Sequence, residues 1–175
     1  MSNMRYMSVV ALFMLVLSCA ASVSVKHDYD PQYDFAALKT YSWLSVQAPA
    51  QASELRVKRF QSAIDRQLET KGMQMVSENP DFMIALHGFT TTKVNVTDYG
   101  YNYGRYWSMG SRNIDVSTYK EGTIFLDFVD SKSKELVWRS SATSVVEPDL
   151  SVEEQEQKFN MAGEKMLAEF PPAAK

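Results

Sequence analysis

Residues 121–145, EGTIFLDFVDSKSKELVWRSSATSV, hold the pattern that decides the fold. Large apolar side chains recur there at every second position, at Ile124, Leu126 and Phe128. A two-residue period is that of a β-strand with one buried face. After the polar SKSK the alternation resumes, with Leu136 and Trp138 on one face. The segment therefore predicts two antiparallel strands joined by a turn of about four to five residues.

Two amphipathic helices are expected on either side of this hairpin along the chain. The first runs from Ser53 to Gly72, because serine is a favoured N-cap and glycine a favoured C-terminal stop. The second opens with the capping-box spacing of Ser151 and Glu154. We expect the face of the first helix that carries Asp65 to be solvated. The apolar stripes that should face the core are Val57, Phe60, Ile64 and Leu68 in the first helix, and Val152, Phe159, Met166 and Phe170 in the second.

Further β-patterns complete the fold prediction. Strands are expected near residues 23–29 and 40–44, and the longest strand-like tract covers 79–103. Runs of strands with two separated helices predict an α+β fold, an antiparallel β-sheet of about five to seven strands with two helices packed on one face. Residues 23–175 are accordingly expected to form a single α+β domain, with a Tyr/Gly-rich segment at 98–112.

The first eighteen residues differ in composition from the rest of the chain. MSNMRYMSVVALFMLVLS has one positive charge, Arg5, followed by an uncharged, mainly apolar run from Met7 to Leu17. A membrane-spanning helix needs about 20 apolar residues, so this run is too short to be one. A charged start, a short apolar middle and a small residue before the cut predict a signal peptide at residues 1–18.

The single cysteine, Cys19, directly follows that apolar run. One cysteine cannot form an internal disulfide, so its place at this junction suggests another use. The sequence VLSC resembles a bacterial lipobox, in which the cysteine carries acyl chains such as palmitate and becomes the mature N-terminus. Residues 19–22 would then be the lipidated N-terminus and its tether. Ala20 after the cysteine resembles lipoproteins sorted to the outer membrane. The alternative is a free thiol, or a residue removed when a peptidase cuts nearby.

Composition and motifs narrow the possible chemistry. The formal net charge of -3 argues against a nucleic-acid-binding surface. The sequence has no phosphate-binding loop, no nucleophile elbow and no zinc-protease motif, so we expect no catalytic residues, no cofactor and no metal site. His27 with Asp28 and Asp30 could be read as metal ligands, but turn residues on the surface are the simpler interpretation.

The segment DYGYNYGRYWSMG, residues 98–110, is the best candidate for a binding surface. On a strand, tyrosines two residues apart would present their phenol rings on one face, which suits contact with carbohydrate or peptide. The alternative is that these rings merely cover the sheet or lie in a loop. The candidate binding residues are Tyr99, Tyr101, Tyr103, Tyr106 and Trp107.

The order of several motifs resembles a known family. They are DYDPQYDFAALKTYSWL (28–44), AIDRQLETKG (63–72), PDFMIALHG (80–88), YKEGTIFLDFVDSKSKELVWRSSA (119–142) and MLAEFPP (166–172). They resemble a family of bacterial envelope lipoproteins known as domain of unknown function 4136. The resemblance implies an α+β domain of exported, usually lipidated proteins, and supplies no catalytic residue, cofactor or partner.

The sequence thus favours a lipoprotein on the periplasmic face of a Gram-negative outer membrane. Its expected partners are the membrane, through the lipid on Cys19, and an envelope protein or peptidoglycan. Its expected role is that of a structural or binding module. The alternative is an envelope hydrolase acting on glycan or peptide, with acids such as Asp127 and a histidine in its cleft.

Overall fold

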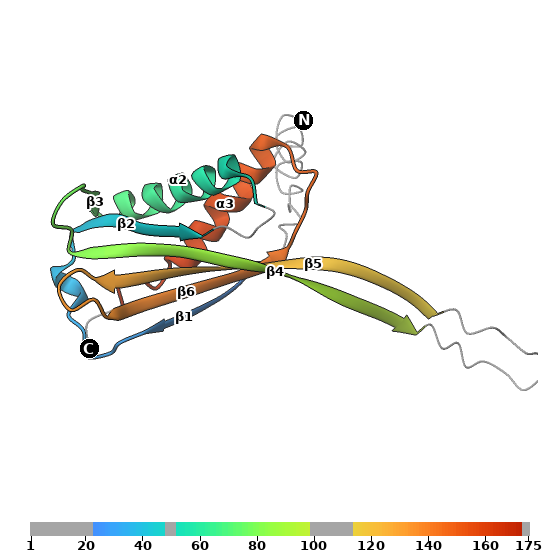
Figure 1. Ribbon diagram of the computed structural model, residues 1–175, viewed down its shortest axis with the longest axis horizontal. Coiled ribbons are helices and arrows are strands. Elements are labelled where there is room, and N and C mark those ends of the chain that lie inside the picture. The colour runs from blue at the N-terminus through green and yellow to red at the C-terminus, as the bar shows by residue number, and fades with distance from the viewer. Residues whose placement is uncertain (1–22, 48–51, 99–113, 173–175) are drawn as a thin grey trace, which may run out of the picture.

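The computed structural model describes residues 23–47, 52–98 and 114–172, in which both long helices cover the same face of one sheet (Figure 1). A short 3₁₀ turn, η1 (Phe35–Ala37), follows the first strand. The strands are β1 (Ser24–Tyr29), β2 (Thr40–Gln47), β3 (Gln74–Met75), β4 (Phe82–Asp98), β5 (Ile114–Asp130) and β6 (Leu136–Val145), and the helices are α2 (Glu54–Thr70) and α3 (Val152–Met166).

The six strands lie in the order β1-β6-β5-β4-β2-β3. The α+β class, the number of strands and the placement of two helices on one face are confirmed. The sheet is mixed, however, because β2 pairs in parallel with both β4 and β3. Helix α2 lies between β2 and the next strands along the chain. It carries the chain back across the sheet, so those strands start at the same end as β2.

Asp81 stabilises the parallel pairing of β2 with β4 at the N-terminal ends of the two strands. Its carboxylate accepts hydrogen bonds from the backbone N–H groups of Lys39 and Thr40 at 2.9 and 2.8 Å, and from Thr40 Oγ1 at 2.9 Å. These bonds, that from the Lys39 N–H foremost, lower the pKa of Asp81. The start of β2 is thereby held beside the residue that precedes β4.

The predicted hairpin is formed by β5 and β6, with residues 131–135 as its turn. Phe128 is paired with Trp138, and Val129 with Leu136, so Val137 is the extra residue of a β-bulge. The expectation that Leu136 shares a face with Trp138 is therefore wrong, because the bulge reverses the alternation between them. Trp138 is fully buried, whereas Leu136 is exposed.

Both helices begin as their sequences predict. Ser53 caps α2 by accepting from the Arg56 N–H, and Ser151 and Glu154 form the expected capping box of α3. Gly72 has a φ of +81°, the left-handed conformation in which glycine commonly ends a helix. Val152 is exposed and does not belong to the core stripe, because it lies in the first turn of α3, where the buried residue is Gln155.

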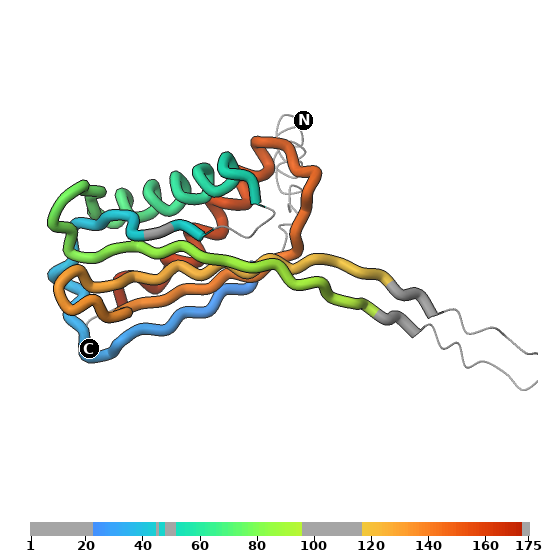
Figure 2. Tube along the Cα trace, in the orientation of Figure 1, coloured from blue at the N-terminus to red at the C-terminus, as the bar shows by residue number. Residues whose placement is uncertain are grey.

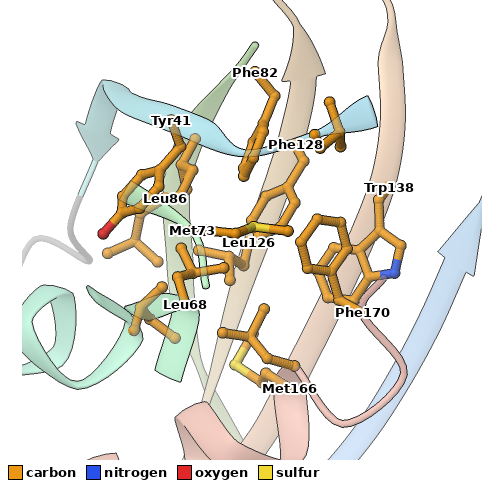
Figure 3. Packing of buried hydrophobic residues seen from close by; sticks show 14 of the residues in the cluster. Tyr41, Leu68, Met73, Phe82, Leu86, Leu126, Phe128, Trp138, Met166 and Phe170 are labelled. Atoms are coloured by element: carbon orange, nitrogen blue, oxygen red, sulfur yellow. The ribbon is translucent and has the colours of Figure 1, made fainter. Parts of the chain in front are cut away.

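Four aromatic rings form the centre of the core between the helices and the sheet (Figure 3). Phe128 lies 4.8 Å from Phe82 and 4.8 Å from Trp138, measured between ring centroids. Phe170, which follows α3, meets Phe128 edge-on at 4.5 Å. Because the four rings come from β4, β5, β6 and the C-terminal segment, their packing joins parts of the chain that are distant in sequence.

Strands β4 and β5 continue past the other strands as a two-stranded ribbon (Figures 1 and 2). Pairing of β4 with β2 ends at His87, and pairing of β5 with β6 ends at Glu121. The two long strands remain paired with each other as far as Asp98 and Ile114. An isolated two-stranded ribbon is only marginally stable in water, so this ribbon depends on the body of the sheet at its base.

Replacing the central ring should cost much of the stability of the fold. Phe128→Ala is expected to lower the free energy of unfolding by about 3–5 kcal/mol, since it leaves a cavity among the four rings. Urea-induced unfolding followed by circular dichroism would measure this loss. Phe125→Ala on the same strand is the matched control, because Phe125 lies on the uncovered face and should cost clearly less. Equal losses for both variants would contradict the assigned core.

Asp130 holds the hairpin turn through its charged form. Its carboxylate accepts from the Tyr33 hydroxyl at 2.5 Å and from the N–H groups of Lys132 and Ser133 at 2.8 and 2.7 Å. The bond from Tyr33 and those from the turn lower the pKa of Asp130 from 3.8 to about 2. A pKa lowered on folding adds stability above the unfolded value, and this contribution is lost as the pH falls toward the folded value.

Asp130→Asn should therefore be less stable than the wild type near neutral pH. The difference should narrow as the pH falls from about 4 to about 2, the interval between the unfolded and folded pKa of the wild-type carboxylate. Urea unfolding at a series of pH values would measure it. Tyr33→Phe, which removes the main hydrogen bond and keeps the carboxylate, should show a smaller change of the same sign. A difference independent of pH would refute the assignment.

Candidate functional site

An apolar pocket of about 530 Å³ lies between the helix layer and the sheet, at the end from which the ribbon leaves. Its volume falls within the range of roughly 300–1,000 Å³ that is usual for small-molecule sites. The sheet forms the floor, with Leu86 of β4, Ile124 of β5 and Ala142 of β6. Helices α2 and α3 form a wall through Phe60 and Phe159, whose rings meet edge-on at 5.6 Å.

Small residues leave room for the pocket in the sheet. Gly88 and Gly122 both line it, and they lie on the helix side of the neighbouring strands β4 and β5. A Cβ atom added at Gly122 would come within 3.3 Å of Val146 Cγ2. Gly122 thus makes space for the loop after β6, as glycine within a strand often does where another part of the chain approaches closely.

The mouth of the pocket carries charged side chains. Three cationic residues line it, Arg56, Lys120 and Lys158, against one carboxylate, that of Glu147. Lys158 Nζ lies 2.6 Å from the Glu147 carboxylate and 3.0 Å from the Val145 carbonyl oxygen. Arg56 donates to the neutral carbonyl oxygen of Pro148 at 2.8 Å, a contact that leaves the positive charge of the guanidinium uncancelled.

The chain enters the described structure beside this pocket. Val23, which precedes β1, is one of the lining residues. Cys19 and the sequence-predicted signal peptide and tether lie outside the described residues. The candidate binding residues Tyr99, Tyr101, Tyr103, Tyr106 and Trp107 also lie outside them, in the segment that joins the far ends of β4 and β5.

The uncovered face of the sheet carries a second polar cluster. Arg139 donates to both oxygens of Asp127, from Nε at 2.6 Å and from Nη2 at 2.5 Å. The Arg139 guanidinium carbon lies 5.5 Å from the centroid of the Phe125 ring, on which the His87 ring stacks at 5.2 Å. The hydrogen bonds to Asp127, followed by its charge, raise the pKa of Arg139.

This cluster brings together two groups that a hydrolase could use. His87 Nε2 lies 3.8 Å from Asp127 Oδ2, beyond hydrogen-bonding distance. Both carboxylate oxygens of Asp127 are taken by Arg139, and only 6% of the residue is exposed. His87 also lines the pocket, but its ring stacks on Phe125, which belongs to the opposite face of the sheet. The arrangement gives Asp127 a structural contact with Arg139.

The other sequence candidates also have structural contacts. His27 Nε2 donates to the carbonyl oxygens of Lys165 and Met166 at 3.2 and 3.0 Å, so the ring caps the end of α3. Asp65, expected in solvent, accepts from Tyr41 and Trp43 at 2.9 and 3.0 Å. Within residues 23–47, 52–98 and 114–172, no group of three or more histidine, cysteine or acidic residues is placed to hold a metal ion.

The sequence matches a family model described as a domain of unknown function, DUF4136, over residues 25–172. The chain belongs to the DUF4136 family. The resemblance inferred from the sequence motifs is thereby confirmed at the level of the domain family. No match was found among curated proteins.

The comparison with solved structures found matches at low sequence identity. A PDZ domain protein from Parabacteroides distasonis matches with 14% identity and a TM-score of 0.53, covering 100% of this chain and 42% of that chain. The DUF4136 chain thus spans less than half the length of that chain. A PelC dodecamer from Paraburkholderia phytofirmans matches with 12% identity and a TM-score of 0.49, covering 84% of this chain and 96% of that chain.

Among the described residues, neither helix has the length and apolar character to cross a membrane.

Sequence reasoning did not find the pocket. Its lining comes from β2, β4, β5 and β6, from Val23 before β1, from both helices and from the loop after β6, so no local pattern contains it. The available signal was a pair of glycines, Gly88 and Gly122, at helix-side positions of two long strands. Glycine inside a strand weakens it and often marks a place where a ligand or another backbone approaches.

The Asp127–Arg139 pair should contribute to stability through its mutual contact. Asp127→Ala leaves the guanidinium without its carboxylate and is expected to lower the free energy of unfolding by about 1–3 kcal/mol, because Asp127 is buried while Arg139 is partly exposed. In a double-mutant cycle with Arg139→Ala, measured by urea unfolding, the second substitution should cost much less than it does alone. Strictly additive losses would contradict the pairing.

Proposed function

We propose that this DUF4136 protein is a lipid-anchored binding module of the cell envelope. Acyl chains on Cys19 would hold it at the periplasmic face of the outer membrane. The signal-like residues 1–18 and the cysteine directly after them support the anchor. Several acyl chains on one residue are enough for stable attachment to a membrane.

The pocket is the observation that carries the binding role. It is concave, lined mainly by apolar side chains and bordered by a few charged ones, which is the composition of sites that bind small molecules. Asp127 and His87, the residues that the sequence offered for hydrolysis, have their partners on the opposite face of the sheet. Their place supports binding by the pocket rather than turnover.

The ribbon gives the module a second surface for envelope partners. Phe89 at its base and Val94 farther along it are exposed, at 52% and 61%. The Tyr-rich segment joins the far ends of its two strands. Exposed aromatic and apolar side chains on a projecting element suit contact with an envelope protein or with peptidoglycan. We include both as partners of the ribbon.

Removing the acylated residue tests the anchor. Cys19→Ala should shift the protein from the membrane fraction to the soluble periplasmic fraction, because the domain would lose its acyl chains. Fractionation of cells by centrifugation, followed by immunoblotting, would measure the shift. Ser18→Ala, which keeps a small residue at the junction and leaves the cysteine in place, should stay with the membrane. Persistence of Cys19→Ala in washed membranes would overturn the anchor.

A further inference from the structure

The pocket has the features of a site for one long hydrocarbon chain with a charged end. Its lining is mainly aliphatic and aromatic carbon, from Val57 and Phe60 of α2 to Ile124 of β5 and Phe159 of α3. Hydrocarbon gains free energy for each methylene group that it buries, without needing a directional polar contact. Polar side chains such as Thr90, Ser144 and Gln155 also line the pocket, but most of the lining surface is carbon.

The charges at the mouth select the sign of the ligand's polar end. Glu147 is matched by Lys158, so the pair contributes little net charge. Arg56 is a further cationic residue of the lining. Positive potential at the mouth attracts an anionic group and disfavours a cationic one. The acceptor that Arg56 uses, the Pro148 carbonyl oxygen, is neutral, so a phosphate or carboxylate could compete for the guanidinium.

The short chain between Cys19 and the pocket indicates that the ligand comes from the membrane. Cys19 precedes Val23 by four residues, and an extended chain advances at most about 3.6 Å per residue. The chain that joins Cys19 to Val23, which lines the pocket, is therefore at most about 14 Å long. A protein anchored through Cys19 would hold the mouth of the pocket close to the membrane surface, where lipids are the most abundant apolar molecules.

From the pocket, its mouth and this short tether, we propose that the protein binds one acyl chain of an anionic membrane lipid. The acyl chain lies between the sheet and the helices, and the headgroup lies at the mouth beside Arg56. This assignment rests on the proposed binding function and names its ligand. It differs from the anchor, because the bound lipid is a separate molecule held without a covalent bond.

Lipid binding can be measured with the purified full chain carrying Cys19→Ala, which has no acyl chains of its own. The protein is incubated with phosphatidylglycerol vesicles, separated from them, and analysed by native mass spectrometry for one retained lipid. Displacement of the fluorescent fatty acid cis-parinaric acid gives the affinity. We expect one lipid per chain, and tighter binding of phosphatidylglycerol than of phosphatidylcholine. Absence of any retained lipid would overturn the proposal.

Two variants with matched controls locate the site. Thr90 lines the pocket from β4, and its neighbour Thr91, which does not line it, points to the other face of the strand. Thr90→Trp should weaken binding at least tenfold by filling the mouth, while Thr91→Trp should leave it unchanged. Equal affinities of these two variants would overturn the site. Circular dichroism melting curves would establish that both are folded.

The charge at the mouth is tested separately. Arg56→Glu should weaken binding of phosphatidylglycerol several-fold and change that of phosphatidylcholine little. Lys58→Glu makes the same charge change on the same helix at a position that does not line the pocket, so it should have little effect. If Arg56→Glu and Lys58→Glu weaken binding equally, the headgroup does not lie beside Arg56 and the proposal fails.

Further outcomes separate this proposal from the proposed function. If the acylated wild type cannot bind lipid while Cys19→Ala can, the protein's own acyl chain fills the pocket, and the proposal of a separate lipid is wrong. If an envelope extract supplies a ligand other than lipid that Thr90→Trp excludes, the pocket binds but its ligand class is wrong. The anchor is judged independently by fractionation, so either result leaves it standing.

Discussion

Contact between Phe128 and three other rings is the interaction on which the rest of the structure depends. Phe82, Trp138 and Phe170 surround it at centroid distances of 4.5 to 4.8 Å. These rings bring together the centre of the sheet, the hairpin strand and the segment after α3. The bulge at Val137 matters for the same reason, since it turns Trp138 toward Phe128. Packing at this density tolerates little change in ring position.

A core on one side of a sheet has consequences for both faces. The helices cover one face, and the other holds the Asp127–Arg139 pair among half-buried side chains. Near the four rings, the helix layer packs closely on the sheet. Toward the ribbon, glycines replace larger residues in the sheet, and the space between the layers becomes the pocket. The pocket thus forms at the end of the sheet where large core side chains no longer fill the space between the sheet and the helices.

Three features of functional interest meet at that end of the domain. The pocket is lined by Val23, where the chain enters the described structure, and by Thr90 and Lys120 at the base of the ribbon. A module anchored through its N-terminus would hold the pocket near the membrane, while the ribbon extends beyond the body of the sheet. The same sheet therefore provides a rigid base for two different surfaces.

The sequence by itself determined the elements that depend on local chemistry. The β5–β6 hairpin, the caps at Ser53 and Ser151 and the turn at Gly72 follow from periodicity and backbone preference, which act over a few residues. Tertiary structure alone decided the parallel pairing of β2 with β4, because that pairing needs the crossover through α2. It also placed Asp65 within hydrogen-bonding distance of Tyr41 and Trp43, and it assembled the pocket from strands and helices distant in sequence. Such features arise from contacts between segments far apart in the chain, which no local pattern records.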